Sequence, residues 1–177
     1  DGKFKTMALA GSKLEYQEWN DKEKEEQKIV ADYIANILEG YNFDRIKVKG
    51  VQTISAGPIQ HLRTHYEAAI GENNPMDIAL NLHPTPAVCG IPKDEVKKYI
   101  LAHEGFDREL YSGFIGVKDS GNFDSFVNLR CMRLYKDRIQ LFAGGGIMAE
   151  SNPEIEWNET QTKLQTLMKV MKDVREE

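Results

Sequence analysis

The last fifth of the chain joins a Gly-rich turn to a helix with charged residues near its start, and this segment constrains the fold most. After Trp157, apolar residues at helical spacing form one stripe at 100° per residue: Leu164, Leu167, Met168, Met171 and Val174. Glu156, Glu159 and Lys163 fall within about 60° of one another along the edge of that stripe. The segment therefore predicts a helix that presents two acids and one base to the same space.

Two interpretations of these charges stay open. Charged residues in the first turns of a helix usually form a solvated face that the helix dipole favours. The glycines before the helix, Gly144, Gly145 and Gly146, offer backbone N–H groups that no side chain blocks. Carboxylates, a cation and open backbone donors together suit an anionic ligand held through a divalent metal. Such a site needs partners elsewhere in the chain.

A second helix is predicted over residues 21–39. Asn20 and Glu23 have the spacing of a capping box, and Gly40 follows as a stop signal. The apolar stripe of this helix has five members: Ile29, Val30, Tyr33, Ile34 and Ile37. Projected backwards, the stripe has Glu26 in its middle, where a carboxylate needs a cation or a proton. The lysines of this segment are expected to point elsewhere: Lys22, Lys24 and Lys28.

The other periodic segments predict strands and short helices. The strands are expected over 3–10, 45–49, 51–56, 59–69, 110–118, 123–135 and 138–142, and the helices over 76–82 and 92–103. Turns are expected at 11–12 and 136–137. Since the order shows no βαβ rhythm, it favours an α+β fold with a largely antiparallel sheet flanked by helices.

Two of these strands carry candidate functional residues. His61, Arg63 and His65 share one face at period two. A partly wet sheet face with mixed polar residues is the alternative interpretation. Arg130 lies among apolar neighbours in the strand predicted over 123–135, and a buried arginine usually has a carboxylate partner, either internal or bound.

Composition excludes some classes of partner. The 177 residues suit one domain, and 23 basic against 28 acidic residues give a net charge of −5, which argues against a nucleic acid partner. No apolar run is long enough to cross a membrane, and nothing resembles a signal peptide. Cys89 and Cys131 lack metal-ligand spacing and fit a reducing, cytoplasmic compartment.

The beginning of the chain suggests a larger domain. The sequence starts at Asp1 and enters a predicted strand almost at once. A strand in this position needs a pairing partner, so we expect the chain to be part of a larger domain. An exposed sheet edge is also expected to permit self-association.

Seven stretches resemble one family in the same order. They are TMALAG (6–11), DKEKEEQKIV (21–30), QHLRT (60–64), LHPTPAVCGIP (82–92), ELYSGFIG (109–116), NLRCMRL (128–134) and FAGGGIMAESNPEIEWNETQTKL (142–164). Together they resemble the C-terminal half of the chorismate-utilising enzymes, and the stretch around Ala87 is similar to isochorismate synthases. Anthranilate and aminodeoxychorismate synthases carry a Pro-Ser-Gly-type sequence there, and salicylate synthases have threonine in place of Ala87.

This resemblance implies a fold and a set of binding residues. Residues 1–177 would form the C-terminal portion of one chorismate-binding domain, an α/β sandwich like that of anthranilate synthase, with the N-terminal half outside this chain. Glu26 and Glu159 would bind Mg²⁺, with Glu156 nearby, and the ion would meet the ring carboxylate of chorismate. His61 would lie near that carboxylate and the site of substitution. The enolpyruvyl carboxylate would be held by Tyr111, Arg130, Lys163 and the N–H groups of Gly144 to Gly146.

The implied reaction is the isomerisation of chorismate to isochorismate, with addition of water at C2 and loss of the C4 hydroxyl. The product would serve menaquinone synthesis or, as the alternative, siderophore synthesis. In the family the base and the acid are a lysine and a glutamate of the N-terminal half, so the chain alone is expected to be inactive. A non-catalytic chorismate-binding or assembly domain and a salicylate synthase are the competing hypotheses. Gln27 stands where relatives commonly have histidine, and no role is attached to it.

Overall fold

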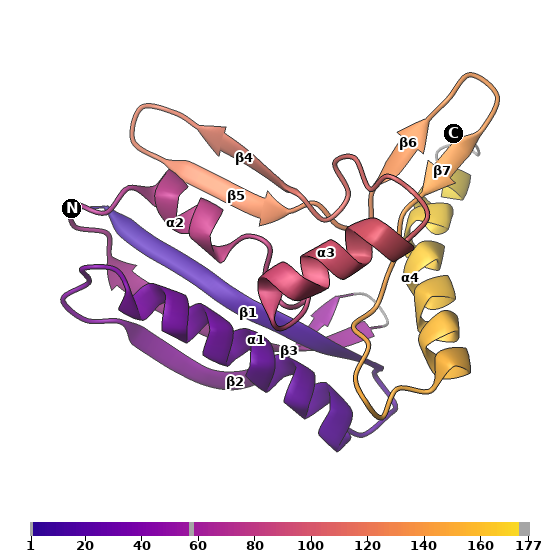
Figure 1. The fold of residues 1–177 in the computed structure, drawn as a ribbon, viewed down its shortest axis with the longest axis horizontal. Coiled ribbons are helices and arrows are strands. Elements are labelled where there is room, and N and C mark those ends of the chain that lie inside the picture. The colour runs from indigo at the N-terminus through magenta and orange to yellow at the C-terminus, as the bar shows by residue number, and fades with distance from the viewer. Residues whose placement is uncertain (1, 57–58, 174–177) are drawn as a thin grey trace.

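The computed structural model describes residues 2–56 and 59–173 (Figure 1). The strands are β1 (Lys3–Leu14), β2 (Lys47–Ala56), β3 (Ile59–Ala69), β4 (Phe114–Lys118), β5 (Phe123–Val127), β6 (Met132–Leu134) and β7 (Ile139–Leu141). The helices are α1 (Asp21–Glu39), α2 (Pro75–Leu82), α3 (Lys93–His103) and α4 (Pro153–Asp173). Within the described ranges, no helix has the length and apolar character needed to cross a membrane.

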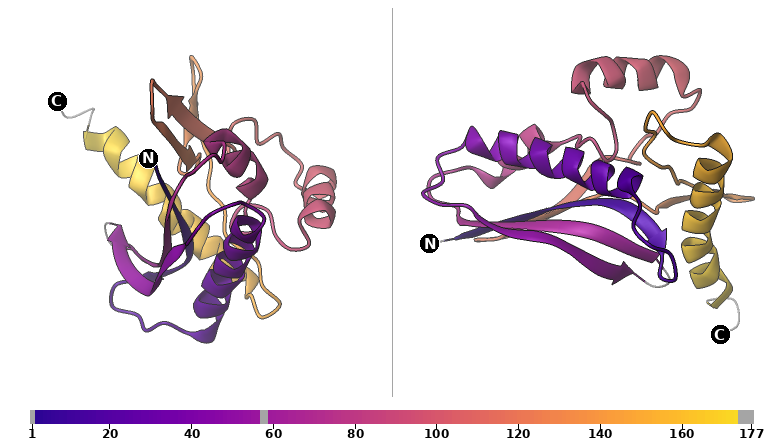
Figure 2. Two further views of the ribbon diagram at one scale, coloured as in Figure 1. Left: turned by 90° about the vertical axis from the view of Figure 1, so that its left-hand side faces the viewer. Right: turned by 90° about the horizontal axis from the view of Figure 1, so that it is seen from below.

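One antiparallel sheet organises the molecule. Its strand order is β1-β3-β2, and two separate hairpins follow, β4-β5 and β6-β7. In the right-hand view of Figure 2, α1 lies along one face of the sheet, and α4 stands at the end of the sheet beside the first turn of α1. The predicted α+β fold with antiparallel sheets flanked by helices is therefore confirmed.

The core lies between α1 and the sheet. Both predicted ends of α1 are confirmed, because Asn20 and Glu23 form the capping box and Gly40 follows as the C-cap. The buried cluster joins six side chains from four elements: Ala8, Val30, Ile34, Leu38, Tyr66 and Ile78. Full burial of each large apolar side chain contributes about 1.5–3 kcal/mol. This packing holds the first turn of α1 at a defined place on the sheet.

Gln27 is a buried polar link between α1 and the sheet. Its side chain is 1% exposed. The amide oxygen accepts a hydrogen bond from Ala10 N at 2.9 Å, and the amide nitrogen donates to Ala8 O at 3.2 Å and to Thr64 Oγ1 at 3.1 Å. Since both polar atoms are paired, the amide can be buried without an unsatisfied group. The sequence attached no role to Gln27, and the structure assigns it this one.

Two strand predictions in the first half need correction. The turn expected at residues 11–12 is wrong, because β1 continues to Leu14 through a bulge at Gly11. Gly11 has φ of 70°, and a Cβ placed on it would lie 2.6 Å from the carbonyl oxygen of Glu23. The segments predicted over 45–49 and 51–56 form the single strand β2, with an irregular register between Lys49 and Gln52.

The strands predicted in the second half are shorter than expected. The segment over 110–118 reduces to β4, and the segment over 123–135 divides into β5 and β6. Each of these two predicted segments contains one non-glycine residue of positive φ, Ser112 in the first and Arg130 in the second. Arg130 therefore lies at a bend between β5 and β6 and not inside a strand.

The C-terminal helix differs from its prediction in length and in its buried face. It begins at Pro153, one turn before Trp157. Of the predicted apolar stripe, three side chains are half-buried: Leu164, Leu167 and Met171. Met168 is exposed, and Val174 lies outside the described residues. Among the side chains described on α4, the buried one is Glu156, which is 6% exposed. Polar contacts therefore place this helix.

Replacing Gln27 tests the link between α1 and the sheet. Gln27→Leu is expected to lower the free energy of unfolding by about 2 kcal/mol, because three hydrogen bonds are lost at a buried site. Urea unfolding followed by circular dichroism measures the change. The matched control is Gln165→Leu on the exposed part of α4, expected to stay within about 0.5 kcal/mol of wild type. Equal stability of the two variants would contradict the assignment.

Candidate functional site

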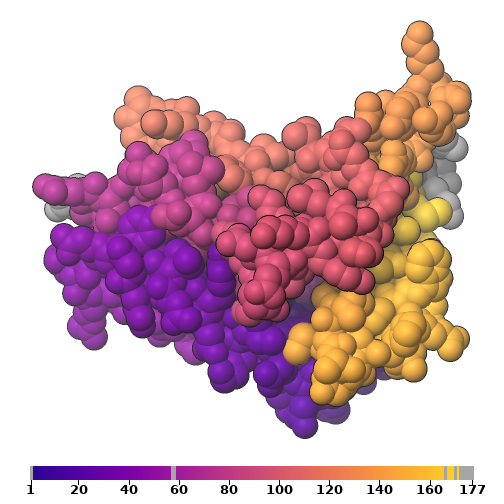
Figure 3. All heavy atoms as spheres, in the orientation of Figure 1, coloured from indigo at the N-terminus to yellow at the C-terminus, as the bar shows by residue number. Residues whose placement is uncertain are grey.

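A recess lies where the start of α1 approaches the start of α4. Its volume is about 1160 Å³. Figure 3 shows the two chain segments that border it, the indigo N-terminal part and the yellow C-terminal helix, next to each other. The lining includes Ser12, Lys22, Ile59, Glu156, Glu159 and Lys163. Charged side chains from both ends of the sequence therefore meet in one space.

A short loop positions the first turn of α4. The side-chain oxygen of Asn152 accepts hydrogen bonds from Glu154 N at 3.0 Å and Ile155 N at 3.2 Å, which satisfies two free N–H groups of the helix start. Ser151 Oγ accepts from Met148 N at 3.0 Å and donates to Glu156 Oε1 at 2.6 Å. Sequence reasoning missed both residues, although Ser-Asn before Pro153 is a typical helix start.

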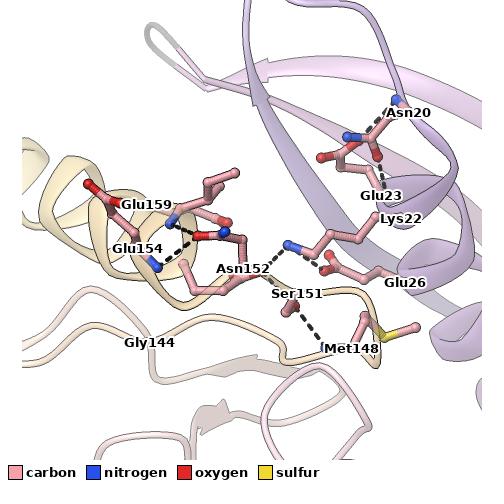
Figure 4. Close-up of polar contacts among 12 residues, drawn as sticks. Asn20, Lys22, Glu23, Glu26, Gly144, Met148, Ser151, Asn152, Glu154 and Glu159 are labelled. Carbon is pink, nitrogen blue, oxygen red and sulfur yellow. Dashed lines mark hydrogen bonds and ion pairs between the residues drawn. The ribbon is translucent and has the colours of Figure 1, made fainter.

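Lys22 is the central cation of the site. Its ammonium forms an ion pair with Glu156 and lies 3.5 Å from Glu26 Oε1. Figure 4 shows Lys22 and Glu26 on α1 directed toward the loop that carries Ser151 and Asn152. Burial alone would lower the pKa of Lys22, but the hydrogen bond that its ammonium donates to Glu156 and the charge of Glu26 raise this pKa above its ordinary value. The prediction that Lys22 points elsewhere is wrong, because residues four apart lie on one side of a helix.

The other predicted carboxylates are also close to cations. Burial raises the pKa of the half-buried Glu26 carboxyl, Lys22 opposes this shift, and the charge of Glu159 adds to it. Glu159 Oε1 lies 2.8 Å from Lys163 Nζ, and the same ammonium donates to Gly144 O at 3.0 Å. Glu26, Glu159 and Lys163 therefore lie around the same part of the glycine run.

The glycine run passes between these side chains. A Cβ placed on Gly144 would lie 2.8 Å from the Tyr111 hydroxyl, a distance too short for a real side chain. A Cβ on Gly145 would lie 3.5 Å from Glu156 Oε2 and 3.8 Å from Lys163 Nζ, and one on Gly146 would lie 3.8 Å from Glu26 Oε1. The backbone therefore lies close to Tyr111 and to the carboxylates. At Gly144 this approach leaves no room for a side chain.

His61 and Arg130 meet on the other side of the site. Ser12 Oγ lies 3.0 Å from His61 Nδ1, and Arg130 Nη2 lies 3.4 Å from His61 Nε2. Burial lowers the pKa of His61, and the charges of Arg130 and Lys163 lower it further. A carboxylate partner was expected for Arg130. Among the contacts of the described residues, the partner of its guanidinium is the imidazole of His61. An arginine with this environment remains able to bind an external anion.

Three of the predicted candidates lie apart from the carboxylates. Arg63 and His65 share the sheet face of His61, and Arg63 donates to Gln52 at 3.2 Å. Ala87 is exposed on the loop that follows α2 and is not part of the lining of the recess. Arg63, His65 and Ala87 are therefore outside the group of residues that surrounds the recess and the glycine run.

The carboxylates have the chemistry of a Mg²⁺ site without forming a preassembled one. Among the described residues, no three His, Cys, Asp or Glu side chains form a metal-binding cluster. Lys22 lies between Glu26 and Glu156, and Lys163 pairs with Glu159. Glu156 Oε2 is nevertheless buried without a hydrogen-bond partner. Hard carboxylate oxygens with one free buried acceptor fit Mg²⁺.

The fold and the site define an α+β domain that gathers carboxylates, cations and open backbone at the end of an antiparallel sheet. The chain belongs to the chorismate binding enzymes, since residues 2–172 match the sequence profile of that family. The isochorismate synthase EntC of Escherichia coli is 36% identical over 153 residues, which cover 85% of this chain and 39% of the relative. This chain thus spans about two fifths of that relative.

Two solved structures are similar to this chain. The crystal structure of a 2,3-dihydroxybenzoate-specific isochorismate synthase, DhbC of Bacillus anthracis, has a TM-score of 0.87 and 31% identity, over 96% of this chain and 49% of that chain. The menaquinone-specific isochorismate synthase MenF of Escherichia coli has a TM-score of 0.83 and 28% identity, over 95% of this chain and 42% of that chain. The fold of the chain is thus the fold of the corresponding part of both enzymes.

The environment of His61 makes stability depend on pH. Because its pKa is lowered in the folded state, the unfolded chain binds more protons between that value and the ordinary one, so stability falls as pH falls through this range. NMR titration of the imidazole should give a pKa below that of a histidine peptide. His61→Gln should lose less stability than wild type between about pH 7 and about pH 5. An equal loss in both proteins would contradict this account.

Proposed function

We propose that this chain is the C-terminal portion, residues 1–177, of the chorismate-binding domain of a cytoplasmic isochorismate synthase. The observation that carries the proposal is the meeting of Glu26, Glu156, Glu159 and Lys163 around the glycine run. Both structural relatives are isochorismate synthases, and both cysteines of this chain are free thiols, as in a reducing compartment. The whole enzyme would add water at C2 of chorismate and release the C4 hydroxyl.

The acidic side of the site would hold a metal ion. Glu26 and Glu159 would bind Mg²⁺, with Glu156 beside them and Oε2 of Glu156 as a free acceptor. The bound ion would supply a fixed positive charge for the ring carboxylate. Ser151 keeps Glu156 oriented through its hydrogen bond, so the carboxylate can stay in place when Lys22 leaves it.

The basic side of the site would hold the substrate. Lys163 and Arg130 would pair with the enolpyruvyl carboxylate, Arg130 as a planar fork and Lys163 as a point charge. Tyr111 and the N–H groups of Gly144 to Gly146 would complete this contact. His61, kept neutral by burial and by Arg130, would face the reacting part of the ring. Ala87 would influence specificity from the loop after α2.

The acid and the base of the reaction are proposed to belong to the part of the enzyme outside this chain. Addition of water needs a base, and loss of the hydroxyl needs an acid. The chain would therefore bind Mg²⁺ and chorismate without turnover. MenF is menaquinone-specific and DhbC is 2,3-dihydroxybenzoate-specific. The isochorismate formed by the whole enzyme would therefore serve the synthesis of menaquinone or of a siderophore. A non-catalytic chorismate-binding domain and a salicylate synthase are the alternatives.

Calorimetry combined with product analysis tests the proposed function. The purified chain should bind Mg²⁺ and chorismate and form neither isochorismate nor salicylate. Glu159→Gln should weaken Mg²⁺ binding about tenfold or more, because one charged ligand is lost. The matched control, Glu154→Gln, changes an exposed carboxylate on the same helix and should bind as wild type does. Turnover by this chain would refute the assignment of acid and base, and absence of binding would refute the site.

Lys22 should compete with Mg²⁺ for the carboxylates. Lys22→Met is expected to tighten Mg²⁺ binding by roughly threefold to tenfold, because an ion pair to Glu156 no longer has to be broken. The same variant should unfold at a lower temperature without metal, since Glu26 and Glu156 lose their counter-ion. Lys24→Met is the control, because Lys24 is exposed and, among the described residues, pairs only with Asp21 at 3.6 Å. Weaker Mg²⁺ binding by Lys22→Met would contradict this role.

We also propose weak self-association through the outer edge of β1. The strand is 12 residues long and lies at the edge of the sheet. Three lysines on it, Lys3, Lys5 and Lys13, would repel a second copy, so added salt should favour pairing. Size-exclusion chromatography should show a dimer fraction that rises with concentration and with salt. A monomer under all of these conditions would contradict the proposal.

A further inference from the structure

The loop between α2 and α3, residues 83–92, is held through its carbonyl groups. Three of its residues are proline and have no N–H to donate. The carbonyl of His83, at one end, accepts from Lys93 Nζ at 2.8 Å. The carbonyl of Val88, next to Ala87, accepts from Arg108 Nη1 at 2.9 Å. A cation therefore binds the loop on each side of Ala87.

A carboxylate fixes the plane of the Arg108 guanidinium. Arg108 Nε lies 2.5 Å from Glu104 Oε2, and Nη2 lies 2.6 Å from Glu104 Oε1. This is a bidentate pair, the geometry in which a guanidinium is most strongly oriented. With two nitrogens committed to Glu104, the third is left to reach Val88 O and, at 3.3 Å, Ser112 Oγ.

The same guanidinium lies against the ring that lines the glycine run. Arg108 Cζ is 5.8 Å from the centroid of the Tyr111 ring, within cation–π range. The Tyr111 ring stacks on Phe142 at 5.5 Å between centroids, and its hydroxyl faces Gly144. Arg108 thus contacts both the loop that carries Ala87 and the ring that approaches the glycines.

We propose that Arg108, oriented by Glu104, is a positioning residue that fixes the loop 83–92 relative to Tyr111. Lys93 holds the other end of this loop. The consequence for substrate binding rests on the proposed function, in which Ala87 and Tyr111 face chorismate. The structural link itself does not depend on that function, and it can be measured without any substrate.

Cys89 reports on the position of the loop. Its thiol is half-buried in the loop, with Sγ 3.6 Å from Lys93 O. In a Cys131→Ser background it is the single thiol of the chain, so its reaction with a disulfide reagent such as DTNB measures loop opening. Arg108→Ala should raise the labelling rate about tenfold, the effect of losing one charge-assisted hydrogen bond.

The direction of this change separates loop opening from electrostatics. Burial raises the pKa of the Cys89 thiol, and the charge of Arg108 lowers it. Removal of Arg108 would by itself leave less thiolate and slow the reaction, because the thiolate is the nucleophile. A faster reaction in Arg108→Ala therefore means that the loop has opened.

Three variants make the test decisive. Arg138→Ala removes an exposed arginine that stacks on Tyr135 on the β6-β7 hairpin and should label at the wild-type rate. Glu104→Gln, which keeps Arg108 but weakens its orientation, should give a smaller increase. Arg108→Lys, which preserves the charge without the fork, should also label faster than wild type. Urea unfolding of each variant shows whether labelling follows global stability.

The outcomes separate the positioning role from the proposed function. Faster labelling at an unchanged unfolding midpoint, with chorismate binding about tenfold weaker and Mg²⁺ binding unchanged, supports the proposal in full. Faster labelling in a protein that never binds chorismate keeps the positioning role and refutes the function. An unchanged labelling rate in Arg108→Ala, or a rate that only follows the loss of global stability, overturns the positioning role.

Discussion

The arrangement of the C-terminal half depends on one buried ionic cluster, in which Lys22 of α1 meets Glu156 of α4 and Glu26. A buried carboxylate is costly unless a cation and hydrogen bonds accompany it, and in this structure Lys22 supplies the cation and Ser151 a hydrogen bond to Glu156. The apolar residues described on α4 are half-buried or exposed and cannot substitute for that anchor. The charges that serve a bound ligand would thus also place the helix that carries them.

The apolar core and the charged site occupy different parts of the molecule. The core fixes α1 on the sheet through Val30, Ile34 and Leu38, and Gln27 completes this contact with hydrogen bonds to β1 and β3. The first turn of α1 extends beyond that core and carries Lys22 and Glu26 to the end of the sheet. A well-packed interior therefore supports the charged residues that gather at the end of the sheet.

The elements that depend on local chemistry were predictable from the sequence. The capping box of Asn20 and Glu23, the stop at Gly40 and the alternation along β3 are all short-range signals, and the structure confirms them. The strands expected over 110–135 were overestimated, because Ser112 and Arg130 have positive φ, which the surrounding contacts impose and β-propensity does not report. The role of Lys22 was missed for a related reason: its partner Glu156 is 134 residues away.

The sequence by itself determined which groups the site contains: two helices with carboxylates on their core-facing edges, a lysine four residues after Glu159, and a glycine run before α4. Helical periodicity and glycine's lack of a side chain are properties of single segments, so they can be read without a partner. Only the tertiary structure decided how these groups pair. It placed Lys22 between Glu26 and Glu156, moved Arg130 beside His61, and joined the Ala87 loop to Tyr111 through Arg108. Ion pairing depends on distance in space, and that distance is set by the packing of segments far apart in the chain.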